Sequence, residues 1–311
     1  MGRFILKRLL LMIPVGLGVV TLTFFIMKMT PGDPVVAFLG DQATPETINA
    51  LRVAWGLDRP LSEQYFGFIG GLFTGDLGTS QVYRLPIAAL IGERLPPTLM
   101  LMLIAAIFAV AISLPIAAWA ATSKSPAVGI VVRFFTATLL GIPTFFLGTL
   151  MLIFLALRLR LFPVGGYGNT FGEHVYSLIL PGLAIGLHIV PLLVRSLVSS
   201  ISESLESDYV AFGRSKGLKQ STVLREYALR NGSISGISIL GIQVGNIAGG
   251  ALVVENVFGI PGMGSMLLGA VLSRDFPVVQ AATVVFGALV VLVYLLTDLG
   301  YGWLDPRARA K

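Results

Sequence analysis

Residues 95–123, LPPTLMLMLIAAIFAVAISLPIAAWAATS, form a run of 29 residues without one charged side chain. A helix crosses about 30 Å of hydrocarbon with about 20 apolar residues, because each residue adds 1.5 Å. Five further uncharged runs of 19 to 24 residues occupy 9–27, 134–157, 174–194, 231–254 and 276–297. Strands of membrane barrels are about 10 residues long and alternate in polarity, so these runs predict membrane-spanning helices.

The composition agrees with this prediction. Only 38 of the 311 residues are charged, which is 12%, and 55% are hydrophobic. Soluble globular proteins carry about 25% charged residues, so the chain lacks the polar surface that a soluble enzyme or a disordered chain needs. The chain contains no cysteine, which excludes disulfides, thiolate metal sites and cysteine nucleophiles.

We therefore predict an all-α integral membrane protein with six transmembrane helices in a single domain, 1–311. The first apolar run follows three basic residues, as in a signal peptide. It is too long for the apolar region of a signal peptide, and Lys28-Met29-Thr30-Pro31 is a poor cleavage site. The predicted helices are 9–29, 98–121, 134–157, 177–198, 232–254 and 278–300, with an outer loop over 30–97 and an inner loop over 199–231.

The distribution of charge predicts the orientation. With the N-terminus in the cytoplasm, the inner segments hold 14 Lys and Arg and 6 acids, and the outer segments hold 8 and 10. The inner side then carries +8 and the outer side −2, as the excess of Lys and Arg in cytoplasmic loops requires. Both termini are expected in the cytoplasm. The net charge of +6 therefore reflects topology, and we expect no nucleic acid partner.

The outer loop 30–97 carries signals for short helices. Pro31-Gly32-Asp33-Pro34 predicts a rigid turn at the exit from the membrane. Thr44-Pro45-Glu46 is typical of a helix start, with an N-cap, a proline in the first turn and an acid near the helix dipole. A second amphipathic stretch runs from Ser62 to Phe73. Since the loop has no histidine and no clustered acid–base set, we interpret it as a lid or scaffold.

The inner loop 199–231 is the most polar part of the inner face. Asp208 is predicted to cap a helix that ends at Gly217, and Ser221 to cap a second helix that continues toward the fifth span. Its basic residues could simply be anchors on the inner side. That interpretation leaves the aromatic and aliphatic residues of the loop unexplained, and these indicate a docking surface: Tyr209, Phe212 and Leu218.

The fifth span carries small and polar residues at helical spacing. Gly241, Gly245 and Gly249 share one stripe, which favours close helix packing over a conducting groove. Gln243 and Asn246 lie three residues apart on one face. They are candidates for the translocation path, although hydrogen bonding between helices explains them equally well.

The sequence lacks the motifs of several common catalytic and binding sites. No Gly-x4-Gly-Lys-Ser/Thr sequence is present, so the chain lacks a P-loop for nucleotide phosphates. His174 and His188 are the only histidines, which excludes a multi-histidine metal site. His188, within the fourth span, is either a hydrogen-bonded packing residue or a residue of the path. We predict neither catalytic residues nor a metal or cofactor on this chain.

Several ordered motifs resemble one family, the membrane subunits of binding-protein-dependent ABC importers of the dipeptide and oligopeptide type. The strongest match is Asp208-Tyr209-Val210-Ala211-Phe212-Gly213-Arg214-Ser215-Lys216-Gly217-Leu218, which is similar to the cytoplasmic EAA loop of that family. Other matching stretches are 3–8, 31–34, 56–61, 75–80, 95–99, 228–231, 254–264, 274–280 and 304–309. The chain departs from the family at Ala211, where Arg or Glu is common, and at Gly213, where Ala is common.

The resemblance implies a type I ABC-importer permease in the bacterial cytoplasmic (inner) membrane. It would pair with a second homologous permease subunit, dock two cytoplasmic ATPase subunits that hold ATP and Mg, and receive substrate from an extracytoplasmic binding protein. The chain itself would not be an enzyme. The residues that would couple it to the ATPase are Asp208, Tyr209, Phe212, Gly213, Lys216, Gly217 and Leu218.

The substrate is less closely defined by sequence. Di- and oligopeptides are the commonest substrates of the family, and nickel, metal chelates and glutathione are the alternatives. A stand-alone channel or proton-coupled carrier is a different class of protein. It would have no need of an amphipathic docking turn at 208–218, which favours the importer.

Overall fold

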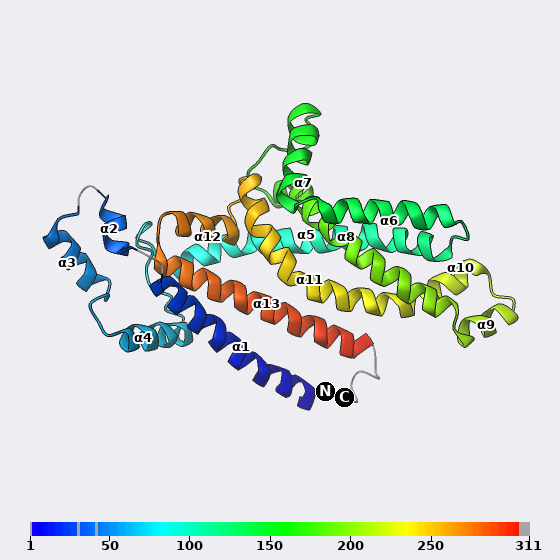
Figure 1. Ribbon diagram of the computed structural model, residues 1–311, viewed down its shortest axis with the longest axis horizontal. Coiled ribbons are helices and arrows are strands. Elements are labelled where there is room, and N and C mark those ends of the chain that lie inside the picture. Colours follow the sequence, from blue (N-terminus) through cyan, green and yellow to red (C-terminus); the bar gives the residue numbers. More distant parts are fainter. Residues whose placement is uncertain (1, 30–31, 41–42, 305–311) are drawn as a thin grey trace. The chain divides into compact units, whose positions relative to one another are not determined.

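The computed structural model describes residues 2–29, 32–40 and 43–304, and within these ranges the fold is helical without a β-sheet (Figure 1). Pro31 of the predicted exit turn and the ending 305–309 lie outside the described residues. The chain divides into two compact units. One contains 1–5, 99–260 and 292–311, and the other contains 6–98 and 261–291.

The unit of 6–98 and 261–291 is built around the outer loop. Its helices are most of α1 (Gly2–Met29), α2 (Pro34–Leu39), α3 (Pro45–Ala54), α4 (Leu61–Thr74), the start of α5 (Ile87–Thr122), α12 (Met263–Leu272) and the first part of α13 (Phe276–Leu304). The predicted start of α3 is confirmed, since Thr44 and Thr47 form a reciprocal capping box. Asp33 caps α2 by accepting a hydrogen bond from the Val35 N–H at 2.9 Å.

Apolar side chains of α5, α12 and α13 form the core of this unit, and they include Ile87, Met263 and Val278. Asp275 is a fully buried acid in front of α13. Its carboxylate accepts hydrogen bonds from the Ser80 hydroxyl at 2.5 Å and from the N–H groups of Gln81 and Val82, both at 3.2 Å. The carboxylate therefore fixes the turn before α5 to the start of α13, 195 residues further along the chain.

The unit of 99–260 is organised around one long helix, α8 (Phe171–Leu205), whose buried residues lie between Leu178 and Ile201. It packs against α6 (Pro126–Gly141), α7 (Thr144–Met151) and α11 (Arg230–Val257) (Figure 1). A capping box between Thr170 and Glu173 begins α8. The remaining helical segments of this unit are η2 (Leu152–Arg158), α9 (Asp208–Ser215), α10 (Gln220–Thr222) and η3 (Val223–Leu229).

The prediction of one continuous helix over 134–157 is wrong. The chain there forms two helical segments, 126–141 and 144–158, bent by 98°. Ile142 is extended with ψ 119°, and Pro143 takes the N-cap position of α7. Proline has no N–H and disfavours a helical conformation in the residue before it, so the helix breaks inside an apolar run.

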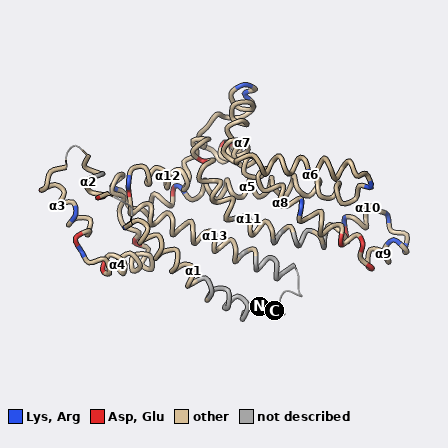
Figure 2. Tube along the Cα trace, in the orientation of Figure 1, with Lys and Arg blue, Asp and Glu red and all other residues tan. Residues whose placement is uncertain are grey.

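Four helices of the described residues are long and apolar enough to cross a membrane, and the bent pair brings the number to five. The four long helices lie within α5, α8, α11 and α13. The apolar part of α1 described here, Ile13–Met29, has 17 residues. Within each unit, few described charges fall along the long helices, and most gather at their ends and in the short helices (Figure 2). The helix α12 was not predicted, because ten residues are too few to suggest a span.

Candidate functional site

The predicted docking loop folds as a short helix, α9, followed by a sharp turn. Ser207 occupies the N-cap position in extended conformation, and Asp208 is the first helical residue. The prediction that Asp208 caps the helix is therefore wrong by one position. The Ser207 hydroxyl donates to the Ser204 carbonyl at 2.5 Å, and Ser207 makes no side-chain capping bond to α9. The Asp208 carboxylate instead lies in the first turn, where negative charge favours the helix dipole.

The C-terminal end of α9 is a Schellman motif. The Gly217 N–H donates to the Arg214 carbonyl at 2.9 Å, and the Leu218 N–H donates to the Gly213 carbonyl at 3.3 Å. Gly217 has φ +77°, in the left-handed region that favours glycine. Gly217, which was predicted to end the helix, therefore adopts the left-handed conformation that the chain reversal after α9 requires.

The surface beside this turn is apolar and exposed. Tyr209, Phe212 and Leu218 are 41%, 61% and 37% exposed, while Val210 is fully buried against the rest of the unit. The ammonium of Lys216 lies 4.5 Å from the centre of the Phe212 ring, a cation–π geometry. The three side chains predicted for docking are thus open to a partner, with Lys216 beside one of them.

The turn leads through a continuous helical path into the membrane. The second helix begins at Gln220 with Lys219 in the N-cap position, so the prediction that Ser221 is the cap is wrong. It continues as a seven-residue π-helix, η3, directly into α11. Val223 and Ala228 of η3 are fully buried, and the rings of Tyr227 and Tyr209 stack at 6.4 Å. η3 therefore contacts both α9 and α11.

Alanine at position 213 should strengthen this loop. Gly213 is buried, and a Cβ built there lies 3.4 Å from the flexible end of Leu218. Since glycine costs about 0.5–1 kcal/mol against alanine inside a helix, Gly213→Ala should stabilise α9 by about that amount. We expect slower hydrogen exchange at 210–216 in the variant and unchanged exchange in α4. Faster exchange at 210–216 would contradict the packing described for Leu218.

A polar groove of about 610 Å³ lies between α8 and α11. Its α8 wall carries polar residues at helical spacing, and Gln243 of α11, only 5% exposed, lies on the opposite wall. The amide of Asn246 donates to Gln243 Oε1 at 2.5 Å, but Asn246 does not line the groove. The groove residues are Leu192, Arg195, Ser196, Ser199, Ser200, Glu203, Ile239, Ile242 and Gln243.

Sequence reasoning missed most of this groove. The fourth span was predicted over 177–198, and no role was predicted for Ser199 or Glu203. The signal was present as a polar stripe over 195, 196, 199, 200 and 203, which places these side chains along one side of α8. The stripe straddles the predicted end of the span, and a division of the chain into spans and loops hides it.

The other predicted residues of the fourth and fifth spans are separate from the groove. His188 lies on α8, and its Nδ1 is buried without a hydrogen-bond partner among the described residues. At Gly241 the Thr297 side chain occupies the space that a Cβ would take, so this glycine permits close packing. Gly245 is partly buried. Gly249 is exposed and has no atom within 4 Å of a built Cβ, so the predicted packing stripe fails there within this chain.

The described residues contain no group of three or more His, Asp or Glu side chains that could hold a metal ion.

Comparison with known proteins identifies the family. Residues 113–310 match the family of binding-protein-dependent transport system inner membrane components, and residues 1–102 match the N-terminal family of the same membrane components. The dipeptide transport system permease protein DppB of Lactococcus lactis is 34% identical over 310 residues, covering 99% of this chain and all of the relative.

Two further relatives are similar over their full lengths. The oligopeptide transport system permease protein AppB of Bacillus subtilis is 34% identical over 99% of both chains. DppB of Escherichia coli K12 is also 34% identical, over all of both chains. The chain belongs to the family of binding-protein-dependent transport system inner membrane components, as its motifs predicted. It is a permease subunit of an ABC importer and a multi-pass protein of the bacterial inner membrane.

Solved structures support the same fold. The chain is similar to a membrane subunit in the MetNI methionine ABC transporter, with a TM-score of 0.57, 15% identity and coverage of 70% of this chain and 96% of that one. It also resembles a chain of an amino acid ABC transporter, with a TM-score of 0.51, 17% identity and coverage of 68% and 93%. At these identities the similarity describes the fold alone.

Proposed function

We propose that this chain forms half of the translocation path of an ATP-driven importer for di- and oligopeptides. Its partners are a second homologous permease subunit, two ATPase subunits and an extracytoplasmic binding protein. The observation that carries the proposal is the exposed apolar turn of Tyr209, Phe212 and Leu218 at one end of α9, in a chain that lacks a P-loop of its own. Relatives named as peptide permeases support the substrate.

The coupling step follows from the packing of this loop. An ATPase cleft holds Phe212 and Leu218, and closure of the ATPase subunits on ATP moves α9. The Schellman turn at Gly217 and the buried contacts of η3 pass that movement to α11. Since α11 forms one wall of the polar groove, its displacement changes access to the groove. ATP binding thereby biases two states of the membrane helices.

The chemistry of the groove suits a peptide. Arg195 and Glu203 lie eight residues apart on α8, which corresponds to about 12 Å along the helix axis. A free peptide carries a carboxylate at one end and an ammonium at the other, and three to four extended residues span about that distance. The serine hydroxyls between the two charges provide hydrogen bonds for the peptide groups.

We further propose six spans with both termini in the cytoplasm. The four long apolar helices and the bent pair supply five spans, and α1 supplies the sixth. This arrangement puts α9 on the inner side, where ATP is available, and the helices α2 to α4 on the outer side, where a binding protein delivers substrate.

The test is uptake by the assembled importer. The two permease subunits, the ATPase subunits and the binding protein are reconstituted into vesicles, and accumulation of radiolabelled Ala-Phe, glutathione and a nickel–histidine chelate is compared. We expect ATP-dependent accumulation of Ala-Phe alone. Accumulation of glutathione or the chelate without Ala-Phe would replace the substrate, and accumulation without ATP would contradict the importer.

A further inference from the structure

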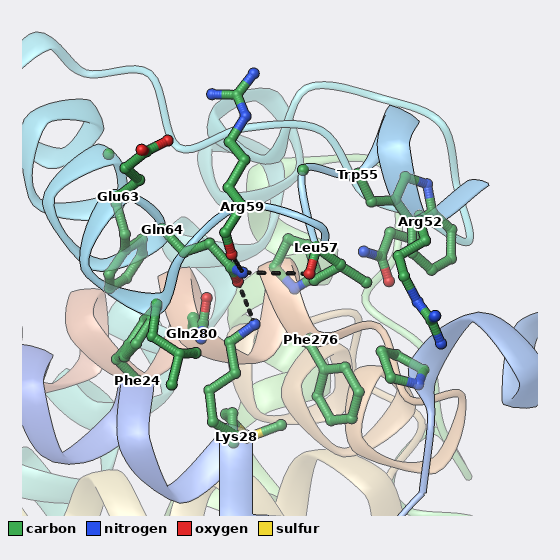
Figure 3. A pocket seen from close by; sticks show the side chains of 18 of the residues that line it. Phe24, Lys28, Arg52, Trp55, Leu57, Arg59, Glu63, Gln64, Phe276 and Gln280 are labelled. Carbon is green, nitrogen blue, oxygen red and sulfur yellow. Dashed lines mark hydrogen bonds between the residues drawn. The ribbon is translucent and has the colours of Figure 1, made fainter. Parts of the chain in front are cut away.

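A second cavity, of about 610 Å³, lies in the unit of 6–98 and 261–291 (Figure 3). This volume falls within the range of about 300–1,000 Å³ that is typical of small-molecule pockets. The pocket is formed by the end of α1, the helices α3 and α4 with the turn between them, and the start of α13. None of the residues assigned above to coupling or to the groove takes part in it.

Lys28 is one of three cations that line this pocket, together with Arg52 and Arg59. The Lys28 ammonium donates a hydrogen bond to Gln64 Oε1 and lies 5.7 Å from the centre of the Phe24 ring (Figure 3). Within the described residues, no carboxylate forms an ion pair with Lys28. An ammonium has three N–H donors, so two remain for a ligand.

Gln64 holds this lysine in place. Its Nε2 donates to the Arg59 carbonyl at 2.8 Å and to the Leu57 carbonyl at 3.4 Å, while its Oε1 accepts from Lys28. The amide of Gln64 therefore bridges the lysine to the turn over 57–59, as Figure 3 shows. A positioned cation is better prepared for a ligand than a free surface lysine, because less side-chain entropy is lost on binding.

The other charged side chains of the pocket either form an ion pair with each other or point away from Lys28. Arg52 forms an ion pair with Asp33. Burial raises the pKa of Asp33, but the hydrogen bond from the Val35 N–H, together with the bond and charge of Arg52, outweighs it and leaves the pKa below its usual value. The Asp33 carboxylate thus stays ionised and neutralises Arg52. The guanidinium of Arg59 and the carboxylate of Glu63 point away from Lys28 (Figure 3).

The remaining walls are apolar and aromatic. Phe24, Trp55, Leu57 and Phe276 line the pocket, and the amide of Gln280 lies near Phe24 (Figure 3). One open ammonium beside aromatic walls suits a carboxylate attached to an apolar group. A bidentate Arg is the best partner for a phosphate, and of the two arginines that line the pocket Arg52 is paired with Asp33 and Arg59 points away from Lys28 (Figure 3).

We propose that this pocket binds the carboxylate end of a peptide whose last side chain is aromatic or aliphatic. Lys28 binds the carboxylate, the aromatic residues enclose the side chain, and Gln280 is available to the peptide group. This inference rests on the proposed peptide import and adds to it a site outside the groove. It makes the helices α3 and α4 part of a binding site as well as a scaffold.

The experiment measures binding of Ala-Phe to the purified full-length chain in lipid nanodiscs by calorimetry. Loss of a charge-assisted hydrogen bond costs about 1.5–3 kcal/mol, so Lys28→Gln should weaken binding about 10- to 100-fold. Lys28→Arg keeps the charge and should lose less than about tenfold. Ala-Phe amide, which lacks the carboxylate, should bind the wild-type chain about as weakly as Ala-Phe binds Lys28→Gln. Lys124→Gln, an exposed lysine in the other unit, is the matched control and should bind normally.

Three results would overturn the inference. The wild-type chain does not bind Ala-Phe, Lys28→Gln binds it as tightly as wild type, or glycerol 1-phosphate displaces it at equal concentration. The last result would assign the pocket to a lipid headgroup. If any of these occurs while the assembled importer still accumulates Ala-Phe, only this site is wrong. If Lys28-dependent binding is found but the assembly transports no peptide, the proposed function is wrong and the site remains.

Discussion

Replacing Gly217 with valine should reduce ATP-driven uptake at least tenfold while leaving the membrane helices folded. Gly217 has φ +77°, and a side chain in the left-handed region costs about 1–2 kcal/mol, more for a β-branched residue. The substitution therefore opposes the Schellman turn and the two hydrogen bonds that present Leu218 beside Phe212. A penalty of about 2 kcal/mol lowers the population of the docking conformation about 30-fold.

Gly75→Val is the matched control. Gly75 ends α4 with the same φ of +77°, so valine there introduces the same backbone strain in the other unit. We expect Gly75→Val to retain full association with the ATPase subunits in a copurification, and Gly217→Val to lose it. Equal association of the two variants would contradict the role assigned to the turn at 213–218.

Of the substitutions proposed here, Asp275→Ala should lower the free energy of unfolding the most. Its carboxylate is fully buried and accepts hydrogen bonds from Ser80, Gln81 and Val82. Removing it leaves three donors without this acceptor, and the buried Ser80 hydroxyl carries the full cost of about 1–3 kcal/mol while the part-buried Gln81 and Val82 N–H groups add less, so a total of about 3 kcal/mol is expected. Thermal unfolding of the purified chain in detergent should then occur at least about 5 °C lower.

Two further variants distinguish the loss of these hydrogen bonds from the general effect of removing a negative charge on the unfolding temperature. Asp275→Asn keeps one acceptor oxygen and should fall between wild type and Asp275→Ala. Asp76→Ala removes an exposed acid that accepts a single bond from the Gly78 N–H, and it should shift the midpoint by less than about 1 °C. A midpoint of Asp275→Ala within that same limit would show that the buried network contributes little.

Features determined within one turn of the chain were predictable from the sequence. The N-cap at Thr44 and the reversal at Gly217 each depend on residues three to five positions away, and both lie where expected. The one-residue error at Asp208 has the same scale, since Ser207 and Asp208 are neighbours and are both good N-cap residues. Long apolar runs likewise marked the long helices of α5, α8, α11 and α13.

Features that depend on distant residues were not predictable. Ser80 and Asp275 are 195 positions apart, and no spacing rule connects them. A count of apolar residues over 134–157 does not reveal the break at Pro143, because a hydropathy value carries no information on whether a residue has a backbone N–H. The groove combines Arg195 and Glu203 of one helix with Gln243 of another, so only the packing of α8 on α11 brings them together.

The most direct test of the central claim is site-directed crosslinking from the docking surface. The chain has no cysteine, so a single introduced cysteine reports without background. Phe212→Cys on α9 and Phe66→Cys on α4 are compared, since the two phenylalanines are similarly exposed, at 61% and 68%. Each purified variant chain is labelled with a photoreactive maleimide before it is assembled with the partner subunits. We predict a covalent adduct with the ATPase subunit from position 212 and none from position 66. No adduct from position 212, or equal adducts from both, would contradict the claim that ATP energy enters this chain at α9.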